Sequence, residues 1–291
     1  MKILNPNIEI LNKFEIQNSK SKTSFGFTFL VCVFCFLFLI FGFSMTASAS
    51  YISLNTTLSS KVEGKTLKVK ISVVNKGDES AYNVQAELRV KGKEILAEKK
   101  TELPVNGTYQ AEKSISLPLL KPGAYPLILV MHYTDANQYP FSALTGQTFV
   151  YQKEAVSPIF GRLKPATFSK EGTLKLALKN LSNTEVKAKT YLVAPRELTV
   201  EEKISAVTLA PKSEESSSFI VKNFSALAGS TYQVFAVSEA EDQDLHYTSI
   251  SPGTVKIIAS QEIFGLNYTV IFAILIALTV VFIAAQFIRK K

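Results

Sequence analysis

Apolar and polar residues alternate along most of the middle of the chain. From Leu67 to Val73 every second residue is apolar, and a lysine or serine stands between each pair. A period of two predicts a β-strand with one buried face. The alternation returns in further segments, separated by turn-forming residues such as Asn106-Gly107. Residues 51–152 therefore predict about seven short strands, which is typical of a β-sandwich.

The later strands of this segment are expected to follow well-defined turns. The turn Lys91-Gly92-Lys93 leads into a strand over 94–103, and the turn Lys121-Pro122-Gly123 leads into a strand over 125–133. We expect the last strand near 146–151.

The segment that follows repeats the first. Gly123-Ala124-Tyr125 corresponds to the segment from Gly229 to Tyr232, and Gly146 corresponds to Gly253, which lies 107 residues later. An offset that stays nearly constant over this length indicates one fold copied in tandem. The chain is therefore predicted to be all-β, with two tandem β-sandwich domains. Their predicted bounds are 50–152 and 153–260.

The first 49 residues have the pattern of a secretory signal. A polar stretch at 1–24 is followed by an uncharged apolar run at 25–43 and then by Ala47-x-Ala49. Signal peptidase reads small residues at these two positions, so we expect cleavage after Ala49. The alternative is an uncleaved signal anchor, because the run at 25–43 is long enough to span a bilayer. Both interpretations place the middle of the chain outside the cytoplasm.

A second apolar run lies near the other end of the chain. Residues 263–288 contain no charged side chain, and Arg289, Lys290 and Lys291 follow them. At about 1.5 Å per residue, a helix of this length crosses a hydrocarbon core of about 30 Å. The basic tail at 289–291 favours the cytoplasmic side. We therefore expect a single-pass protein of the cell membrane with a transmembrane helix at 263–288.

Small side chains recur on one face of this predicted helix, four residues apart. Such a row lets two membrane helices approach each other closely, so a protein partner in the membrane is one hypothesis. The row consists of Gly265, Thr269, Ala273 and Ala277.

The formal net charge of +8 lies mostly outside the alternating middle of the chain. Residues 51–262 hold 25 Lys plus Arg against 22 Asp plus Glu, which leaves only +3. The remaining excess flanks the two apolar runs and acts as a topology signal. No basic face with interleaved aromatic residues is present, so nucleic acid is not an expected partner. Both cysteines, Cys32 and Cys35, lie in the first apolar run.

The turns of the first copy carry a characteristic set of residues. Val73-x-Asn75-x-Gly77 precedes Ala81-Tyr82-Asn83-Val84, and Pro122-Gly123-x-Tyr125 precedes Tyr133-Thr134-Asp135. This set resembles the cell-adhesion-related bacterial Ig-like repeats of prokaryotic surface proteins. The second copy departs from it, since Asn180-Leu181-Ser182-Asn183 replaces the glycine-containing turn. The resemblance implies an extracytoplasmic Ig-like sandwich with adhesion or scaffolding roles, and it carries over no catalytic residue.

Residues that carry chemistry are few in the alternating segment. Its two histidines, His132 and His246, have no Cys or His at metal-ligand spacing, and we expect them at the surface or at strand ends. No nucleophile-elbow pattern is present, so we expect neither a catalytic site nor a cofactor. An acidic loop at 239–244 is the best candidate ligand site, for Ca²⁺, although a solvated hairpin tip is the simpler interpretation. The candidate ligands are Glu239, Glu241, Asp242 and Asp244.

These features favour a non-catalytic, adhesion-like binding or scaffolding protein of the cell envelope that is integral to the membrane. Its two modules would present loop tips or sheet edges to a protein partner. The alternative is an accessory subunit of a membrane transport or secretion complex, which contacts its partners through the transmembrane helix. An envelope hydrolase is a minor alternative, because a Ser-His-Asp arrangement can be assembled from distant parts of a sequence.

Overall fold

The computed structural model of the protein describes residues 51–118, 120–201, 204–259, 262–263, 266–267, 269–274, 276–278 and 281. Several predictions fall on other residues and lie outside this description. They concern the signal segment with Ala47 and Ala49, both cysteines, Gly265, and the tail Arg289, Lys290 and Lys291.

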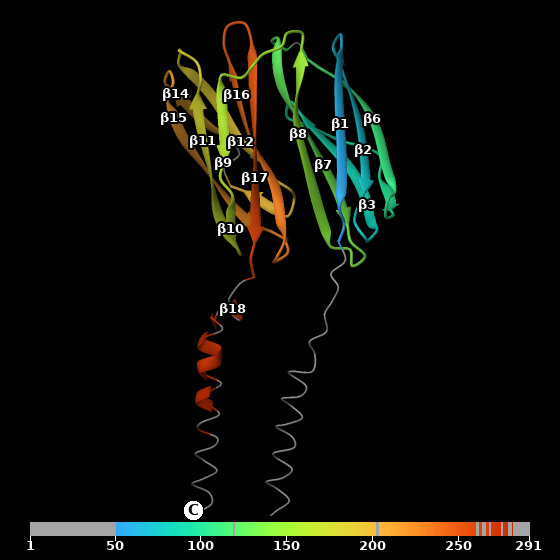
Figure 1. Ribbon diagram of the computed structural model, residues 1–291, viewed down its shortest axis with the longest axis vertical. Coiled ribbons are helices and arrows are strands. Elements are labelled where there is room, and N and C mark those ends of the chain that lie inside the picture. Colours follow the sequence, from blue (N-terminus) through green and yellow to red (C-terminus); the bar gives the residue numbers. More distant parts are fainter. Residues whose placement is uncertain are drawn as a thin grey trace, which may run out of the picture. The chain divides into compact units, whose positions relative to one another are not determined.

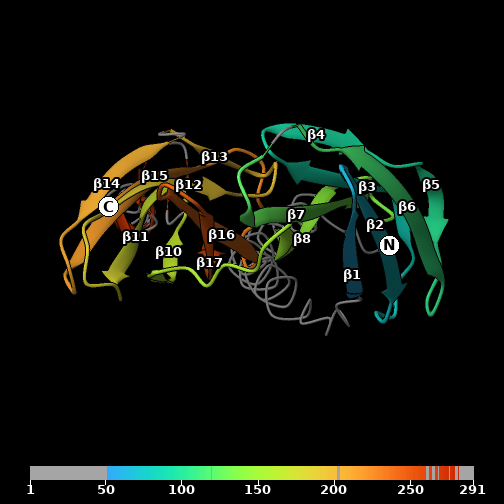
Figure 2. The ribbon, with the colours of Figure 1, turned by 90° about the horizontal axis from the view of Figure 1, so that it is seen from above.

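Eight strands form a first β-sandwich. One of its sheets has the order β1-β2-β6 and is antiparallel, and in the facing sheet β7 lies between β3 and β8 (Figures 1 and 2). Two short strands, β4 and β5, pair with β3. The strands are β1 (Leu54–Glu63), β2 (Thr66–Asn75), β3 (Ala81–Val90), β4 (Lys93–Leu96), β5 (Lys100–Leu103), β6 (Thr108–Ser116), β7 (Gly123–Thr134) and β8 (Pro140–Tyr151).

Two of the expected strands have different bounds in the structure. The single strand expected over 94–103 is two strands, β4 and β5, which pair with opposite ends of β3. The interruption lies beside a bulge in β3, where Asn83 has φ 53° and the register with β7 shifts. The last strand begins at Pro140, well before 146, because it forms a hairpin with β7 along its whole length.

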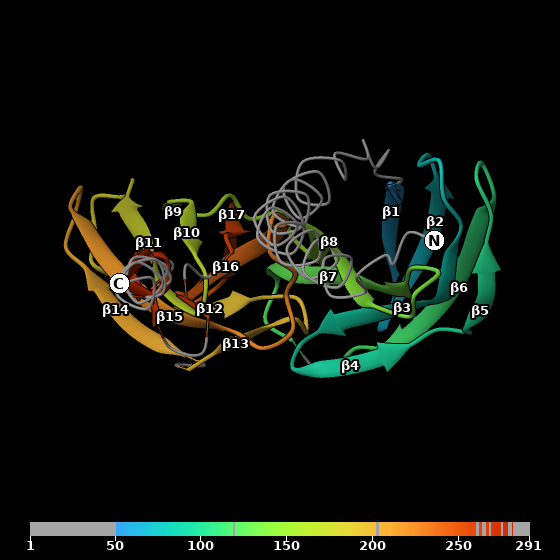
Figure 3. The same ribbon diagram turned by 90° about the horizontal axis from the view of Figure 1, so that it is seen from below.

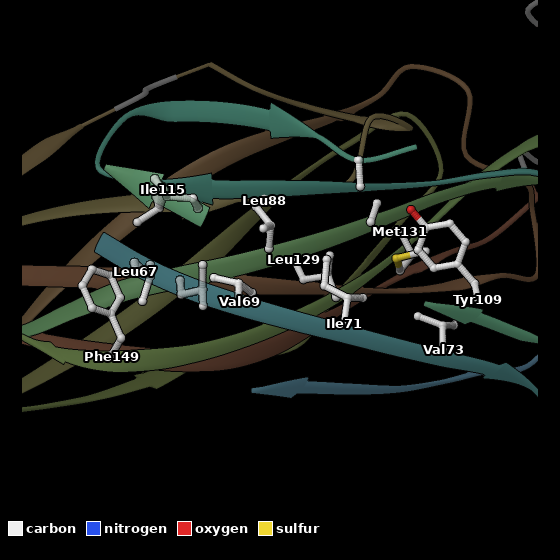
Figure 4. Close-up of a cluster of buried hydrophobic side chains, with 14 of the residues drawn as sticks. Leu67, Val69, Ile71, Val73, Leu88, Tyr109, Ile115, Leu129, Met131 and Phe149 are labelled. Atoms are coloured by element: carbon white, nitrogen blue, oxygen red, sulfur yellow. The ribbon is translucent and has the colours of Figure 1, made fainter. Parts of the chain in front are cut away.

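Alternating side chains of β2 fill the core of the first sandwich, as the period of two predicts. Leu67, Val69 and Val73 are fully buried, while the lysines between them are exposed. They pack against Leu88 of β3 and Leu129 of β7 (Figure 4). Each such side chain contributes about 1.5–3 kcal/mol through the apolar surface that it removes from water.

Nine strands form a second β-sandwich, built in a similar way. One sheet has the order β13-β15-β11-β9, and the other has the order β14-β12-β16-β17 with β10 parallel to β17 (Figure 3). Its buried core is a separate cluster that includes Leu174, Leu176 and Phe219. The strands are β9 (Ile159–Leu163), β10 (Ala166–Phe168), β11 (Glu171–Asn180), β12 (Val186–Val193), β13 (Leu198–Val200), β14 (Ser205–Leu209), β15 (Glu214–Asn223), β16 (Thr231–Glu241) and β17 (His246–Ile257).

The expected helix does not start directly after the second sandwich. β18 (Glu262–Ile263) pairs with β19 (Leu266–Asn267), so the backbone hydrogen bonds of these residues run between two short strands. The helix expected from Ile263 is therefore wrong for its first residues. Helical residues follow at 269–274, 276–278 and 281. Within the described part of the chain, no helix has the length and apolar character needed to cross a membrane.

Candidate binding site between the two sandwiches

The two sandwiches contact each other through the outer faces of their larger sheets. Strand β7 is buried over ten consecutive residues, whereas β2 alternates between buried and accessible positions. Both faces of β7 are therefore covered, one by the core of the first sandwich and the other by the second sandwich. The side chains that meet there form a third apolar cluster, which consists of Ile128, Val130, Leu144, Val193, Phe235 and Val237.

A single parallel backbone pairing joins the two large sheets. Gly123 at the start of β7 pairs with His246 at the start of β17. The His246 N–H donates to Pro122 O at 2.9 Å, and the Thr248 hydroxyl donates to Ala124 O at 2.9 Å. Gly123 has φ 143°, and a Cβ there would overlap the backbone of His246. Only glycine therefore allows the two chain segments to come this close.

A cluster of charged groups around the buried Glu87 carboxylate closes another part of the junction. The Glu87 carboxylate of the first sandwich accepts from Arg89 Nε at 2.6 Å and from His132 Nε2 at 2.8 Å. Arg196 of the second sandwich donates to the same carboxylate at 3.1 Å. Burial by itself raises the pKa of Glu87, but the bonds from Arg89 and His132 outweigh it and hold that pKa below its ordinary value. Glu87 is therefore a paired, ionised carboxylate at neutral pH.

A hollow of about 420 Å³ opens beside the backbone pairing. Its wall consists of residues of β12, β16 and β17, a residue just before β14, and one turn of the first sandwich. That turn joins β3 to β4 and holds Lys91 and Gly92 at φ 47° and 71°, as a tight hairpin turn requires. The lining residues are Lys91, Lys187, Lys189, Tyr191, Ile204, Glu239, Ala240, Glu241 and His246.

Glu239 and His246 are bonded to each other in the wall of this hollow. His246 Nε2 lies 3.1 Å from a Glu239 carboxylate oxygen, and the Tyr191 hydroxyl donates to the other at 2.9 Å. Burial tends to raise the pKa of Glu239, but these two hydrogen bonds together lower it below its ordinary value. His246 Nδ1 faces Ala124 O at 2.8 Å, so both ring nitrogens face acceptors.

Aromatic and cationic groups stack where the two sandwiches meet. The ring of Tyr125 in β7 stacks on His246 with the centroids 3.9 Å apart and the planes at 13°. Lys91 Nζ lies 4.7 Å from the centroid of the same tyrosine ring. This cation–π contact holds the lysine at the mouth of the hollow. Burial raises the pKa of Tyr125 to about 12, so its ring stays neutral.

The structure changes the interpretation of the acidic segment 239–244. Glu239 and Glu241 belong to strand β16, so the predicted acidic loop is wrong for its first half. Asp242 holds the turn, since its carboxylate accepts from the Tyr247 hydroxyl at 2.6 Å and from the Leu245 N–H at 2.7 Å. Asp244 is exposed. Among the residues that the structure describes, no group of three His, Cys, Asp or Glu side chains is placed to hold a metal ion.

The histidines do not lie at the surface, although His246 does stand at the end of a strand, as the first residue of β17. His246 retains 2% of its accessible surface and His132 retains 9%, because both lie at the junction, which the sequence pattern did not reveal. Each histidine contacts a carboxylate, the buried Glu87 for His132 and the half-buried Glu239 for His246.

The predicted row of small residues is described only in part. Thr269, Ala273 and Ala277 are helical, and all three are exposed in the described chain. The proposed contact of this row with a partner helix stays a prediction.

No family model matches the chain, and no curated protein matches its sequence. Escherichia coli alpha-2-macroglobulin in its native conformation matches 71% of this chain with 17% of its own, at 12% identity and a TM-score of 0.28. Red sea bream transglutaminase matches 77% of this chain with 33% of its own, at 12% identity and a TM-score of 0.25. A protein of unknown function from Porphyromonas gingivalis W83 matches 70% of this chain with 99% of its own, at 9% identity and a TM-score of 0.29.

Proposed function

We propose that the protein is a non-catalytic binding or scaffolding protein of the cell envelope, whose two sandwiches act as one rigid platform. The observation that carries this proposal is the junction, where apolar side chains of both sandwiches are buried against each other. Modules connected only by a linker move independently, whereas a buried interface suppresses such motion. A rigid pair can hold surface groups of both modules at a constant separation for a partner.

The buried charges support a defined arrangement of the pair. Arg196 donates across the junction to Glu87, which is buried in the first sandwich. A displacement of the second sandwich would remove one of the donors of this buried carboxylate. Because an unpaired buried charge is costly, the cluster favours one docked geometry over its alternatives.

The proposed location follows from the two ends of the sequence. The apolar runs at 25–43 and 263–288 and the basic tail support export and a C-terminal membrane anchor, with the sandwiches outside the cytoplasm. The resemblance of the first copy to adhesion-type Ig-like repeats fits the same proposal. It rests on turn and core residues such as Asn75, Gly77 and Tyr125.

The rigidity can be tested by distance measurements between two spin labels. The full chain, with Cys32→Ser and Cys35→Ser, would carry one label at Glu112→Cys in β6 and one at Ser218→Cys in β15, both exposed positions. We expect one narrow distance distribution in detergent. Gly123→Ala should broaden it, because the added Cβ would overlap His246. Phe235→Ala, which only removes junction contacts, should broaden it to a smaller extent. A broad distribution before either substitution would contradict the proposal.

A second candidate function is that of an accessory subunit in a membrane complex. The observation that favours it is the exposure of apolar side chains on the helical residues, including Phe272, Ile276 and Leu278 at 61–63%. Such side chains need a lipid or protein environment. Ala273→Leu with Ala277→Leu should reduce crosslinking to a partner in native membranes, and Phe272→Leu, which keeps an apolar side chain, serves as the control. Unchanged crosslinking would exclude the small-residue row as the contact.

A further inference from the structure

We propose that the hollow between the sandwiches binds the oxyanion group, a carboxylate or a phosphate, of a small ligand. This proposal deepens the binding function and rests on it, because the hollow is lined by residues of both sandwiches. Lys91 comes from the first sandwich, and Lys187 and Lys189 come from the second. A volume of about 420 Å³ is sufficient for a small organic acid or phosphate ester.

The three lysines line the same hollow. In β12 the buried residue Ala188 separates Lys187 from Lys189, so both lysines project from the outer face of the strand. Two such side chains start about 6–7 Å apart, which suits two oxygens of one oxyanion or two acidic groups of one ligand. Lys91 approaches from the other sandwich, held above Tyr125.

The carboxylates of the hollow already have other partners than Lys187 and Lys189. Glu239 is bonded by His246 and Tyr191, and the charge of Lys91 also acts on it. Glu241 is paired with Lys121 at 3.5 Å, and Lys121 also donates to Asp242 O at 2.5 Å. The carboxylates of Glu239 and Glu241 therefore already have cationic or hydroxyl partners.

Lys187 and Lys189 have few ionic contacts in the described part of the chain. Lys187 Nζ lies 3.9 Å from the Glu185 carboxylate, and both side chains are exposed. Lys189 forms no ion pair with any residue in the described part of the chain. Surface ion pairs of this kind contribute little, so a bound oxyanion can displace them. Excess positive charge therefore remains available to a ligand.

An apolar side chain at the rim indicates what else the ligand contains. Ile204, which precedes β14, lines the hollow and is 66% exposed. An exposed branched aliphatic side chain beside three cations fits an amphipathic ligand, such as a short-chain carboxylate or a phosphate ester with a carbon skeleton. Free inorganic phosphate shares the charge recognition but lacks this contact.

Calorimetric titration of the full chain in detergent tests the site with three probes. These are inorganic phosphate, succinate, and succinamide as the uncharged analogue of succinate. We expect one of the two anions to bind and succinamide not to bind. The Lys187→Ala, Lys189→Ala double variant should weaken anion binding at least tenfold at low salt. The matched control is Lys175→Ala with Lys179→Ala, which removes two exposed lysines from β11.

The outcomes separate this proposal from the proposed function. If neither anion binds at millimolar concentration, or if the β11 control loses as much affinity, the oxyanion site is wrong. Phosphate binding without succinate binding would identify a phosphate group, and the reverse would identify a carboxylate. Labelled samples of the same chain report the distance between the sandwiches. A narrow distance distribution without anion binding overturns only the site, whereas a broad one overturns the rigid platform.

Discussion

Glu197 is a buried carboxyl group whose protonation is coupled to its surroundings at the junction. It retains 1% of its accessible surface, and Oε2 has no hydrogen-bond partner among the described residues. The hydroxyl of Ser142 lies 3.2 Å from Oε1 and 3.1 Å from His132 Nδ1. Ser142 donates to Oε1, which tends to lower the pKa of Glu197, but burial is the larger cause and raises that pKa above its ordinary value.

Substitution of Glu197 by glutamine should make stability less sensitive to rising pH. A carboxyl group with a raised folded pKa stabilises the fold fully below its ordinary value of 4.5, and that contribution is lost as the pH rises through the folded value. Glu197→Gln removes this loss. We therefore expect the melting temperature of the variant, relative to that of the parent, to rise between pH 5 and pH 8. The relative rise should be about 2–4 °C for each kcal/mol of stability that the parent loses through Glu197 in this range. Parallel melting curves across this range would show that Glu197 is not the group responsible.

Asn180 shows that a residue can keep its role although the motif around it changes. The side chain of Asn75 donates to Glu79 O and accepts from the Gly77 N–H. Asn180 does the same with Thr184 O and the Ser182 N–H, and both asparagines are fully buried. The turn of the second copy therefore needs the asparagine and not the glycine.

At the scale of the element, β7 differs from the half-buried strands around it. Its sequence from Tyr125 to Met131 is apolar without interruption, whereas β2 alternates. Strands that are covered on both faces have continuous apolar runs. This continuous apolar run is the feature of the sequence that could have indicated a covered outer face on β7. Periodicity alone can identify such a strand, but it cannot say which other surface covers its second face.

Val130 in β7 should respond to substitution as a core residue although it points away from the core of its own sandwich. It is fully buried, in the junction cluster. An aspartate there would be an unpaired buried charge, so Val130→Asp should lower the free energy of unfolding by more than about 3 kcal/mol. Val150→Asp is the control, because Val150 in β8 is 44% exposed, and it should cost less than about 1 kcal/mol. Denaturant unfolding followed by circular dichroism compares them, and equal costs would contradict the covered face.

The sequence predicted the elements better than it predicted the site, for a physical reason. The period of two and the turn residues are local, so they placed β2, the Lys91-Gly92 turn and the repeat near 107 residues correctly. The site depends on contacts between Lys91 and residues about 100 positions later, and on the burial of His246. A lysine on an outer sheet face has the same local sequence pattern whether that face contacts a second sandwich or only water.

At the scale of the molecule, acid should weaken the junction before it unfolds the sandwiches. His132 contacts Glu87 and Ser142, with Arg196 and Arg89 nearby, and burial is the main cause that lowers its pKa. The unfolded chain then binds a proton that the folded chain resists, so stability is lost as the pH falls below the ordinary value of 6.5. The lowered pKa of Glu87 adds a further loss below its ordinary value of 4.5.

The distance distribution between the labels on β6 and β15 measures this effect. In a Glu197→Gln background, which removes the opposite effect of Glu197, we expect it to broaden between pH 7 and pH 5. It should broaden less when His132→Gln is added, because that substitution removes the titrating ring. Broadening that is identical in both chains would assign the effect to other groups.

The two sandwiches meet through equivalent surfaces. Ile128 and Val130 of the first copy lie 107 residues before Phe235 and Val237 of the second, and all four belong to one cluster. The apolar part of the contact is thus nearly isologous, like that of a homodimer whose subunits have been fused into one chain, whereas the pairing of Gly123 with His246 joins non-equivalent positions. An isologous contact closes on itself. A third copy added to the chain could not bind to this face, because both sandwiches already bury it. A longer array would therefore need a different contact surface.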